Sequence, residues 1–412
     1  MRCNKKIMIL GAGEGQIPLI HRAKDAGWHT IVVSPKGDYP GFALADEIAY
    51  CNIADVDAIA DLAQTMQINA IATDQTDIPV MAIRQVSQKM ELPAIQCEDI
   101  NNFRYKSRMR QLCQSAGIKT IPYRVSDNLA DVEQFFRLLE GDPVILKPVD
   151  SQGSRGVTRV GSLSELQEAY DKAMSYSKEK KVIVELFIDG QEVEVDTVMY
   201  HNEIKAVLIG DVFNFRSIPI FSAYERIYPS QLPEVTQAEI RRVNAQTLSI
   251  LGIHTGWTHG EYMVAKNGDV YLLEVGARGG GNYIGSDIVR TMMGVSTDEM
   301  AFRTAIGDDS FYNEVGLTGK CCAYKCFCLP EGQISAINID EEWLNSDIVL
   351  RHNLKDLHIG KICHRTTDKT SRYTVIVVAD NHQQLRKILD DIPSHINVMV
   401  KKNGHIKNCI WQ

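Results

Sequence analysis

Short apolar runs separated by stretches of helical periodicity dominate the first hundred residues of the chain. The runs that we expect as strands are 6–10, 29–33, 68–73 and 93–97. Between them, segments such as 17–27 place apolar residues at helical spacing. Short strands that alternate with helices predict an open parallel α/β sheet, here named the leader domain (residues 1–100). Because ligands of such sheets bind at the carboxyl ends of strands, the loops 11–16 and 73–77 are candidate substrate loops.

The loop 11–16, GAGEGQ, invites a dinucleotide-binding interpretation, but two positions argue against it. The GxGxxG fingerprint requires a third glycine where this chain has Gln16. It also requires an acid near the end of the second strand, where this chain has Ser34 and Pro35. A tight turn in a Rossmann-like domain that holds no dinucleotide is the better interpretation.

The pattern changes after residue 100. The segments with strong patterns are, in order, a helix over 106–117, strands over 143–149 and 181–188, a helix over about 235–252 and a hairpin over 259–281. After about residue 316, a smaller segment closes with a strand, a helix and a strand. We therefore expect a chain of α/β and α+β class with three domains, over residues 1–100, 101–315 and 316–412.

Two glutamates face each other in the predicted hairpin over 259–281. Its turn, Asn267-Gly268, is typical of a type I′ turn, in which both central residues have positive φ. Residues equally distant from that turn pair across the ladder, so Glu261 lies opposite Glu274. Like charges that lie directly opposite each other destabilise a pair of strands.

The same register pairs Met263 with Leu272 and Ala265 with Val270, which predicts an apolar, buried face around the two glutamates. Two carboxylates that are buried together need a cation to compensate their charge. Mg²⁺, a hard ion with oxygen ligands, fits this requirement. A register slipped by one residue would instead leave one glutamate in solvent, and the hairpin alone leaves both interpretations open.

Composition and charge are those of an ordinary soluble globular protein. The 412 residues are 44% hydrophobic and 23% charged, and the formal net charge of -8 gives no general affinity for nucleic acid. No apolar run approaches the length of about 18 residues that a membrane span requires. The first residues lack the apolar stretch and the cleavage site of a signal peptide. We therefore expect a cytoplasmic protein whose ten cysteines are reduced thiols.

Four of the cysteines stand close together, and the motif CCAYKCFC raises the question of a metal site. The spacing of Cys321, Cys322, Cys326 and Cys328 matches no common zinc motif. Cys322, Tyr324, Cys326 and Cys328 instead alternate with period two, which predicts a half-buried strand in which the cysteines act as small apolar residues.

Two further motifs are weak when taken separately. Lys147 ends an apolar strand before the loop 150–156, whose small residues could present backbone N–H groups to an anion, although the segment is not a Walker A loop. A surface lysine beside a turn is the alternative. Glu185 and Glu192 flank an apolar strand end and a turn, and could accept hydrogen bonds from a purine amine and a ribose. Two solvated glutamates are the alternative there.

Taken in order, these parts resemble the ATP-grasp superfamily. The matching parts are the leader domain, a helix that opens with Lys106, Lys147 before a glycine loop, the pair Glu185 and Glu192, and a glutamate hairpin that ends in Glu274-x-x-x-Arg278. The resemblance covers about residues 1–315. It is strongest to the branch that contains carbamoyl-phosphate-synthase-like amino-acid ligases and the purine-pathway carboxylase and formyl transferase. It implies a Rossmann-like pre-ATP-grasp domain, a two-lobed ATP-grasp fold with a mobile lid lobe at about 120–190, and a small C-terminal α+β unit.

The resemblance also implies a role for each matching residue. The expected nucleotide contacts are Lys106 at the α-phosphate, Lys147 at phosphate and adenine, Gly153, Ser154 and Gly156 over the phosphates, Glu185, Leu186 and Ile188 at the adenine, and Glu192 at the ribose. Glu261 and Glu274 would bind Mg²⁺, and Arg278 and Lys147 would stabilise the transferring phosphoryl group. The family usually has a third metal ligand, an asparagine, where this chain has Gly276. The number of Mg²⁺ ions, one or two, therefore stays open.

The implied function is an ATP-dependent ligase that activates a carboxylate as an acyl phosphate and joins it to an amine. Carboxylation or formyl transfer of the purine-pathway type, and a non-catalytic nucleotide-binding regulatory protein, are the alternatives. The expected partners are a small-molecule carboxylate and an amine, and a homodimer through the leader domain is a candidate because such dimers are common in the family. The segment 213–230, which contains Arg216, Glu225 and Arg226, could line a pocket for a charged substrate or be ordinary core and surface.

Overall fold

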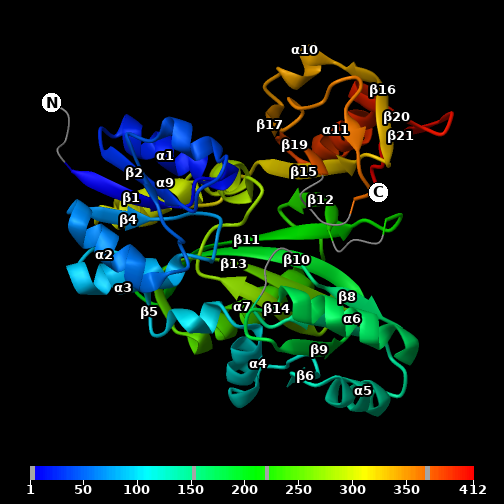
Figure 1. Cartoon of the computed structure of the whole chain (residues 1–412), viewed down its shortest axis with the longest axis horizontal. Helices are drawn as coiled ribbons and strands as arrows, with labels where there is room; N and C mark the ends of the chain where they lie inside the picture. The colour runs from blue at the N-terminus through cyan, green and yellow to red at the C-terminus, as the bar shows by residue number, and fades with distance from the viewer. Residues whose placement is uncertain (1–4, 151–154, 219–221, 367–371) are drawn as a thin grey trace.

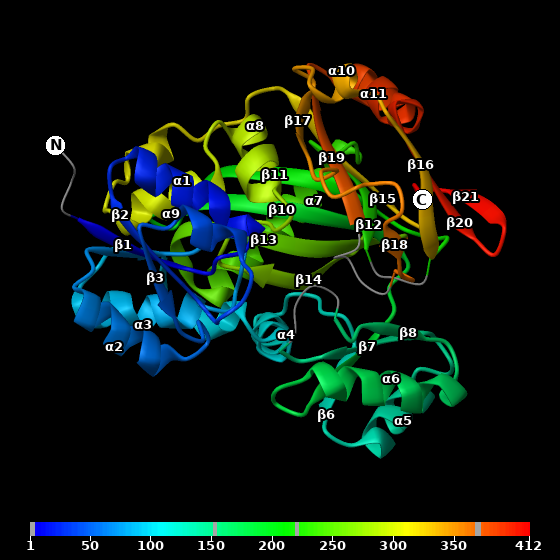
Figure 2. The ribbon, with the colours of Figure 1, turned by 45° about the horizontal axis from the view of Figure 1, so that its top comes forward.

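The computed structural model describes residues 5–150, 155–218, 222–366 and 372–412, and arranges them around one large central sheet (Figures 1 and 2). The leader domain is a sheet of four parallel strands in the order β3-β2-β1-β4, which confirms the expected open α/β sheet. Its strands are β1 (Lys6–Leu10), β2 (His29–Ser34), β3 (Glu47–Tyr50) and β4 (Ala70–Ala72). Alternate strand residues pack against α1 (Ile17–Asp25) on one face and against α2 (Val56–Met66) and α3 (Val80–Met90) on the other.

One expected strand of the leader domain is placed elsewhere. Of residues 93–97, only β5 (Gln96–Cys97) is a strand, and it pairs antiparallel with β13 (Ile253–Ala265) of the central sheet. The fourth leader strand is β3, which the apolar pattern did not predict because its residues are mostly exposed. The chain therefore leaves the leader domain by crossing directly onto the next one.

The central sheet has nine strands, eight of them in the order β14-β13-β10-β11-β12-β15-β19-β17 with β5 beside β13. The strands not yet given are β10 (Gly190–Tyr200), β11 (Glu203–Asn214), β12 (Ala223–Tyr228), β14 (Val270–Gly276), β15 (Cys321–Cys328), β17 (Val349–His352) and β19 (Arg372–Ala379). Helix α7 (Glu234–Leu251) packs on one face, where it buries Val193 and Val195. Because side chains alternate along a strand, Glu192, Glu194 and Asp196 of β10 lie on the opposite face.

A small lobe precedes the central sheet in sequence. Its antiparallel sheet has the order β6-β9-β7-β8 and is covered by two helices. The elements are β6 (Tyr123–Ser126), α5 (Leu129–Leu138), β7 (Val144–Pro148), β8 (Thr158–Val160), α6 (Leu163–Tyr176) and β9 (Val182–Leu186). Helix α4 (Lys106–Ser115) joins this lobe to the rest of the molecule, and Figure 2 shows the lobe standing apart from the central sheet.

The C-terminal unit (residues 316–412) shares its strands between two sheets. Strands β15, β19 and β17 extend the central sheet, while β16 (Gly332–Ile339), β18 (Ile362–Cys363), β20 (Ile396–Lys402) and β21 (His405–Asn408) form a second one. Helix α11 (His382–His395) contributes its apolar face to the core between them, and α10 (Glu341–Leu344) lies near β17. No helix in the described ranges combines the length and the apolar character of a membrane span.

The cysteine-rich strand is β15, and the prediction that it is half-buried is wrong. All eight of its residues are buried, because one face packs into the core shared with the leader domain and the other into the core of the C-terminal unit. A strand in the middle of a sheet with both faces covered is apolar on both sides. The alternating Cys322, Tyr324 and Cys326 mark only one of the two buried faces.

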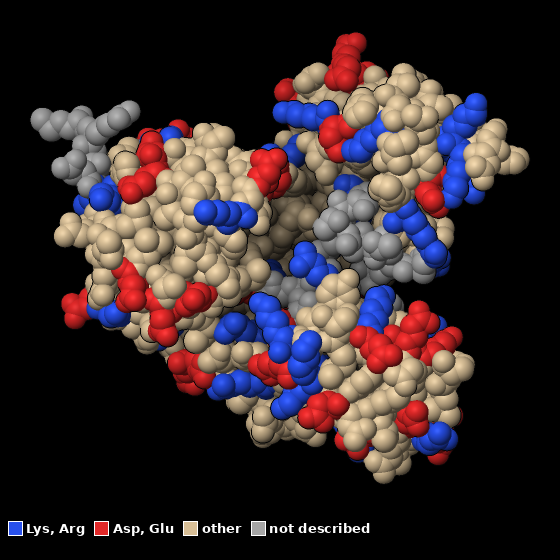
Figure 3. All heavy atoms as spheres, viewed as in Figure 1, with Lys and Arg blue, Asp and Glu red and all other residues tan. Residues whose placement is uncertain are grey.

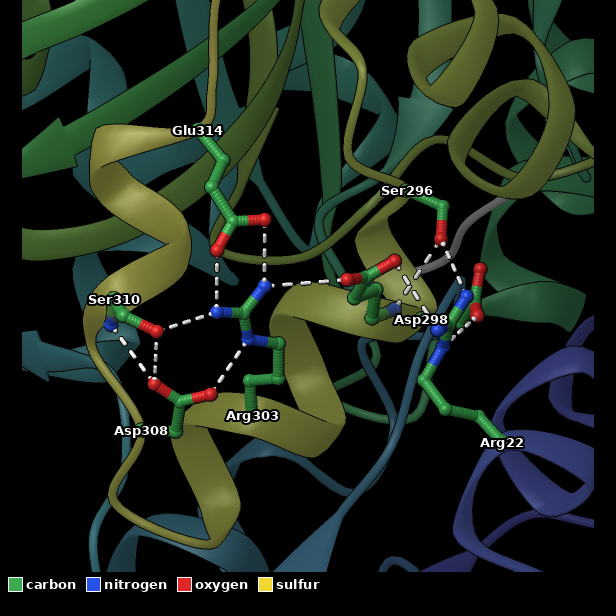
Figure 4. A network of polar contacts seen from close by, with 8 residues as sticks. Arg22, Ser296, Asp298, Arg303, Asp308, Ser310 and Glu314 are labelled. Atoms are coloured by element: carbon green, nitrogen blue, oxygen red, sulfur yellow. Dashed lines mark hydrogen bonds and ion pairs between the residues drawn. The ribbon is translucent and has the colours of Figure 1, made fainter. Parts of the chain in front are cut away.

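Ion pairs fix the leader domain on the central body (Figure 4). Arg22 of α1 donates to Asp298 at 2.8 Å and to Ser296 at 3.2 Å, both at the start of α9 (Thr297–Ala305). Farther along α9, Arg303 lies 2.8 Å from Asp308 and 2.7 Å from Glu314. The loop 73–77 of the leader domain also contacts this region, because Thr297 donates to Asp74 at 2.8 Å and Arg278 donates to Asp77 at 3.0 Å.

Candidate functional site

The hairpin of β13 and β14 places Glu261 directly opposite Glu274, as expected. The expected turn is wrong, however. Gly268 has φ of +88°, but Asn267 is not in the left-handed region, so a type I′ turn is excluded. The N–H of Gly268 donates to the carbonyl of Ala265 at 2.9 Å, which makes a three-residue turn closed by a left-handed glycine.

A bulge restores the register between the turn and the glutamates. Tyr262 lies opposite Leu272 and Met263 opposite Tyr271, so the expected pairings of Met263 with Leu272 and of Ala265 with Val270 are wrong. Leu273 has no partner across the ladder, and its carbonyl accepts a hydrogen bond from Arg110 of α4 at 2.8 Å. The extra residue shifts the pairing by one, which returns the two glutamates to opposite positions.

The two glutamates are compensated by lysine and arginine side chains in this structure. Lys106, the first residue of α4, lies 2.6 Å from Glu274. Burial alone would raise the pKa of Glu274, but the Lys106 ammonium lowers it to about 2. Lys106, Glu261 and Glu274 therefore form one electrostatic unit, in which the lysine relieves the repulsion between the carboxylates.

The strand lysine also has a carboxylate partner. Lys147 of β7 lies 2.5 Å from one oxygen of Glu185 of β9, and Arg110 donates to the other at 2.9 Å. All three side chains are buried, at 10% exposure or less. Sequence analysis missed Arg110, although its place four residues after Lys106 puts both basic groups on one face of α4.

Strand β10 carries a row of three acidic residues, Glu192, Glu194 and Asp196, of which only Glu192 was expected in the site. Glu192 accepts from Asn214 at 2.6 Å, and burial together with the charge of Glu261 raises the pKa of Glu192 to about 7. Glu194 lies 2.7 Å from Arg226 of β12. The alternation in the segment EVEVD was the available signal, because it predicts three acids on one face.

His259 of β13 joins this row. Its Nδ1 lies 2.9 Å from Asp196, and its Nε2 lies 3.9 Å from Glu194. Within the described ranges, Glu194, His259 and Glu261 are the one group of His, Cys and acidic side chains whose ligand atoms all lie within 4.8 Å of one another.

Arg278, two residues after β14, is held by the leader domain. Its Nε and Nη2 donate to the two oxygens of Asp77, each at 3.0 Å. A side chain at Gly276 would place its Cβ 2.7 Å from the same carboxylate. Asp77 therefore fills the space beside Gly276, where the resembling family has its asparagine.

Most of these groups line one cavity of about 430 Å³ between the small lobe, the central sheet and the loop 73–77. The molecule is visibly hollowed between the leader domain and the C-terminal unit in Figure 3. The expected site residues that line the cavity are Lys106, Lys147, Glu185, Leu186, Ile188, Glu192, Glu261, Glu274 and Arg278. Gly156 is buried between the cavity-lining Arg155 and Val157. Gly153 and Ser154 lie outside the described residues.

The donor set of this cavity fits Mg²⁺. Glu261 and Glu274 face each other across the ladder, with Glu192 and Glu194 on the neighbouring strand, so the cavity offers the hard oxygen donors that this ion takes. Most of these carboxylates already contact a cationic or amide group. An ion could therefore enter by taking the place of a side-chain cation.

Two protein families match parts of this chain. The family described as an ATP-grasp domain matches residues 140–287, and the ribonucleotide synthetase preATP-grasp domain matches residues 4–97. A D-alanine–D-alanine ligase of Trichlorobacter lovleyi is 32% identical over 42% of this chain and 54% of its own length. A formate-dependent phosphoribosylglycinamide formyltransferase of Haemophilus ducreyi is 27% identical over 48% of this chain and 51% of its own. The chain thus spans about half the length of these curated relatives.

Solved structures match over nearly the whole chain. An L-amino acid ligase from Bacillus licheniformis covers 98% of this chain and all of its own, with a TM-score of 0.78 and 21% identity. A phosphoribosylglycinamide synthetase from Anaerococcus prevotii covers 97% of this chain and all of its own, with a TM-score of 0.74 and 21% identity. At this identity the likeness establishes the fold.

Proposed function

Because the chain belongs to the ATP-grasp superfamily, we propose that it is an ATP-dependent ligase that joins a small-molecule carboxylate to an amine. One observation carries the proposal. Facing carboxylates, Glu261 and Glu274, share a single cavity with Lys106, Lys147 and Arg278. Phosphoryl transfer needs this combination, because positioning and neutralisation of charge supply most of its catalysis.

The nucleotide would lie between the small lobe and the central sheet. The side chains and backbone assigned to it are Lys106, Lys147, Gly153, Ser154, Gly156, Glu185, Leu186, Ile188 and Glu192. Lys106 and Lys147 would bind the phosphates, with Glu185 and the strand that follows it at the adenine. Glu261 and Glu274 would hold one or two Mg²⁺ ions, which neutralise phosphate charge when bound.

In the proposed reaction, an oxygen of the substrate carboxylate attacks the γ-phosphorus, and the bond to the β-phosphate breaks. The products of this step are ADP and an acyl phosphate. Arg278, held by Asp77, is placed to neutralise the transferring phosphoryl group. The amine then attacks the acyl carbon and expels phosphate, which leaves an amide and one released proton.

A second candidate is carboxylation or formyl transfer of the purine-pathway type. The similarity to the formyltransferase of Haemophilus ducreyi favours it over other ATP-dependent reactions. It uses the same phosphoryl chemistry, with bicarbonate or formate as the activated carboxylate. The two candidates therefore differ in which acid stimulates ADP release.

The test is ADP release over a matrix of carboxylates, bicarbonate and formate against amines, with Mg²⁺ present. We expect release that requires one organic carboxylate and one amine together. Arg278→Ala should reduce it by roughly two to three orders of magnitude, as loss of a transition-state donor does. Arg242→Ala, an exposed change on α7, is the matched control and should leave the rate unchanged. Undiminished release by Arg278→Ala, or release with bicarbonate or formate alone, would contradict the proposal.

A further inference from the structure

The cavity contains an arginine that the proposed ligase reaction has not used. Arg226 of β12 lines the cavity together with Ser222, Asn214 and His259. Within the described ranges its guanidinium donates only through Nε, to Glu194 at 2.7 Å. Its Nη1 is buried and has no hydrogen-bond partner.

Ser222 presents a second unused donor. It is 6% exposed, it lines the same cavity, and its buried hydroxyl has no hydrogen-bond partner among the residues that the structure describes. A buried N–H or O–H without a partner is costly, and most buried polar groups are satisfied. Two such groups four residues apart, on one cavity wall, indicate a ligand that accepts hydrogen bonds from both.

The wall that carries these donors is rigidly built. The backbone carbonyl of Ala223, next to Ser222, accepts from Arg372 of β19 at 2.8 Å. The ring of Tyr324 of β15 lies 5.1 Å from the Arg226 guanidinium and 5.7 Å from that of Arg372. The C-terminal unit thus fixes both the start of β12 and the arginine in place.

We propose that Arg226 and Ser222 form a subsite for a carboxylate that does not react, carried by the amine substrate. The amine substrate is then an amino acid, and the product keeps a free carboxylate. This inference rests on the proposed ligase function. It assigns the carboxylate that reacts with ATP to Arg278, and the non-reacting carboxylate of the amine substrate to Arg226.

Two observations separate this subsite from the reacting centre. Arg278 follows β14, and β13, β10 and β11 lie between β14 and β12. Four strand spacings put the two strands about 19 Å apart. Arg278 contacts Asp77 of the leader domain, whereas Arg226 contacts Glu194 of β10, so the two guanidinium groups have different partners and Arg226 can take an anion of its own.

Charge favours a carboxylate over a phosphate. Glu194 already neutralises Arg226, so a dianion beside this pair would be under-compensated. A single negative charge that approaches Nη1 and the neutral Ser222 hydroxyl adds less repulsion. The ammonium of an incoming amino acid would find the carboxylate of Glu194 nearby, which lines the cavity beside Arg226.

The experiment compares L-amino acids with their carboxamides, the matching decarboxylated amines and O-phosphoethanolamine as acceptors. We expect the wild type to favour the amino acids through KM. Arg226→Lys keeps a cation for Glu194 but loses the second N–H group that would bind the carboxylate. It should raise the amino-acid KM roughly 10- to 100-fold, which corresponds to the loss of one hydrogen bond to a charged group. Ser222→Ala should raise it roughly 2- to 10-fold. Neither should change the KM of the carboxamide or of ATP.

Arg386→Lys is the matched control, because Arg386 contacts Glu225 on the other face of β12 at 3.1 Å. Equal KM for amino acid and carboxamide in the wild type would overturn the subsite. So would an equal rise for both acceptors in Arg226→Lys, or a preference for O-phosphoethanolamine. If no acceptor stimulates ADP release, the ligase proposal fails instead. Calorimetric binding of L-alanine against L-alaninamide, in wild type and Ser222→Ala, then still decides whether the subsite exists.

Discussion

Replacement of Arg110 by methionine tests how the end of the cavity that we assign to the nucleotide is held together. The Arg110 side chain is 1% exposed. Its Nε donates to Glu185 at 2.9 Å and its Nη2 donates to the carbonyl of Leu273 at 2.8 Å, at the bulge that sets the register of the two facing glutamates. Methionine keeps most of the volume and removes both hydrogen bonds.

The expected loss of stability follows from these two contacts. Glu185 keeps Lys147 at 2.5 Å, so no buried carboxylate is left without a cation. Loss of the charged hydrogen bond costs about 1.5–3 kcal/mol, and an unsatisfied carbonyl at Leu273 costs about 1–3 kcal/mol. The buried Nη1 of Arg110, which has no partner, is removed as well and offsets part of this. We expect a net loss of about 3 kcal/mol in the free energy of unfolding.

Urea unfolding followed by intrinsic fluorescence measures this difference. The matched control is Arg108→Met on the same helix, because Arg108 is 43% exposed and its one ion pair within the described ranges is with the exposed Asp99. That exposed pair should be worth less than about 1 kcal/mol. A loss below 1 kcal/mol for Arg110→Met, or equal losses for the two variants, would refute the view that Arg110 fixes the bulge and the adenine-side carboxylate.

Three further changes test other parts of the structure. Gly276→Asn should cost about 1–3 kcal/mol in a thermal-unfolding measurement, because its Cβ would lie 2.7 Å from Asp77, whereas the control Gly281→Asn should cost less, because a Cβ there would meet no atom of the described residues within 4 Å. Burial and the nearby Asp298 raise the pKa of Asp74 from 3.8 to about 7. The wild type therefore has its full stability below pH 4, where Asp74 is protonated, and loses stability as pH rises through 7, where the folded protein must bury a charged carboxylate. Asp74→Asn has no such charge. It should be more stable than wild type at pH 8, by up to about 4 kcal/mol, and equal to it near pH 4. Cys322→Ser should cost about 1–3 kcal/mol by the same thermal measurement, because Cys322 is fully buried. A buried hydroxyl needs a hydrogen-bond partner, whereas a buried thiol does not.

The facing of Glu261 and Glu274 was predicted correctly from a register that is wrong in its details. The local rule for Asn-Gly hairpins gave a two-residue turn, whereas the structure has three residues in the turn. The bulge at Leu273 compensates for the difference. That bulge is stabilised by Arg110, which lies far away in sequence, and no local pattern in the hairpin contains this contact.

Residue types along the chain indicated which side chains enter the cavity, but not what those side chains contact. Lys147 and Glu185 were assigned separately to a nucleotide, yet they bond each other here. Asp77 was part of a candidate substrate loop, and its bond to Arg278 joins residues 201 apart in sequence. Such pairs depend on how domains pack, which the periodicity of single segments does not describe.

The charge balance of the cavity explains how one chain can keep so many acids and bases together. Glu274 contacts Lys106 and Glu185 contacts Lys147, so the side chains that we assign to Mg²⁺ and ATP neutralise one another in this structure. Separating buried charges without replacing their partners is strongly unfavourable. In the proposed reaction, phosphate oxygens would take the place of the carboxylates as acceptors for the two lysines, and Glu261 and Glu274 would be the carboxylates that hold Mg²⁺. Binding is then an exchange of partners rather than a net burial of charge, and the cavity can close on a nucleotide without leaving any of these side chains unpaired.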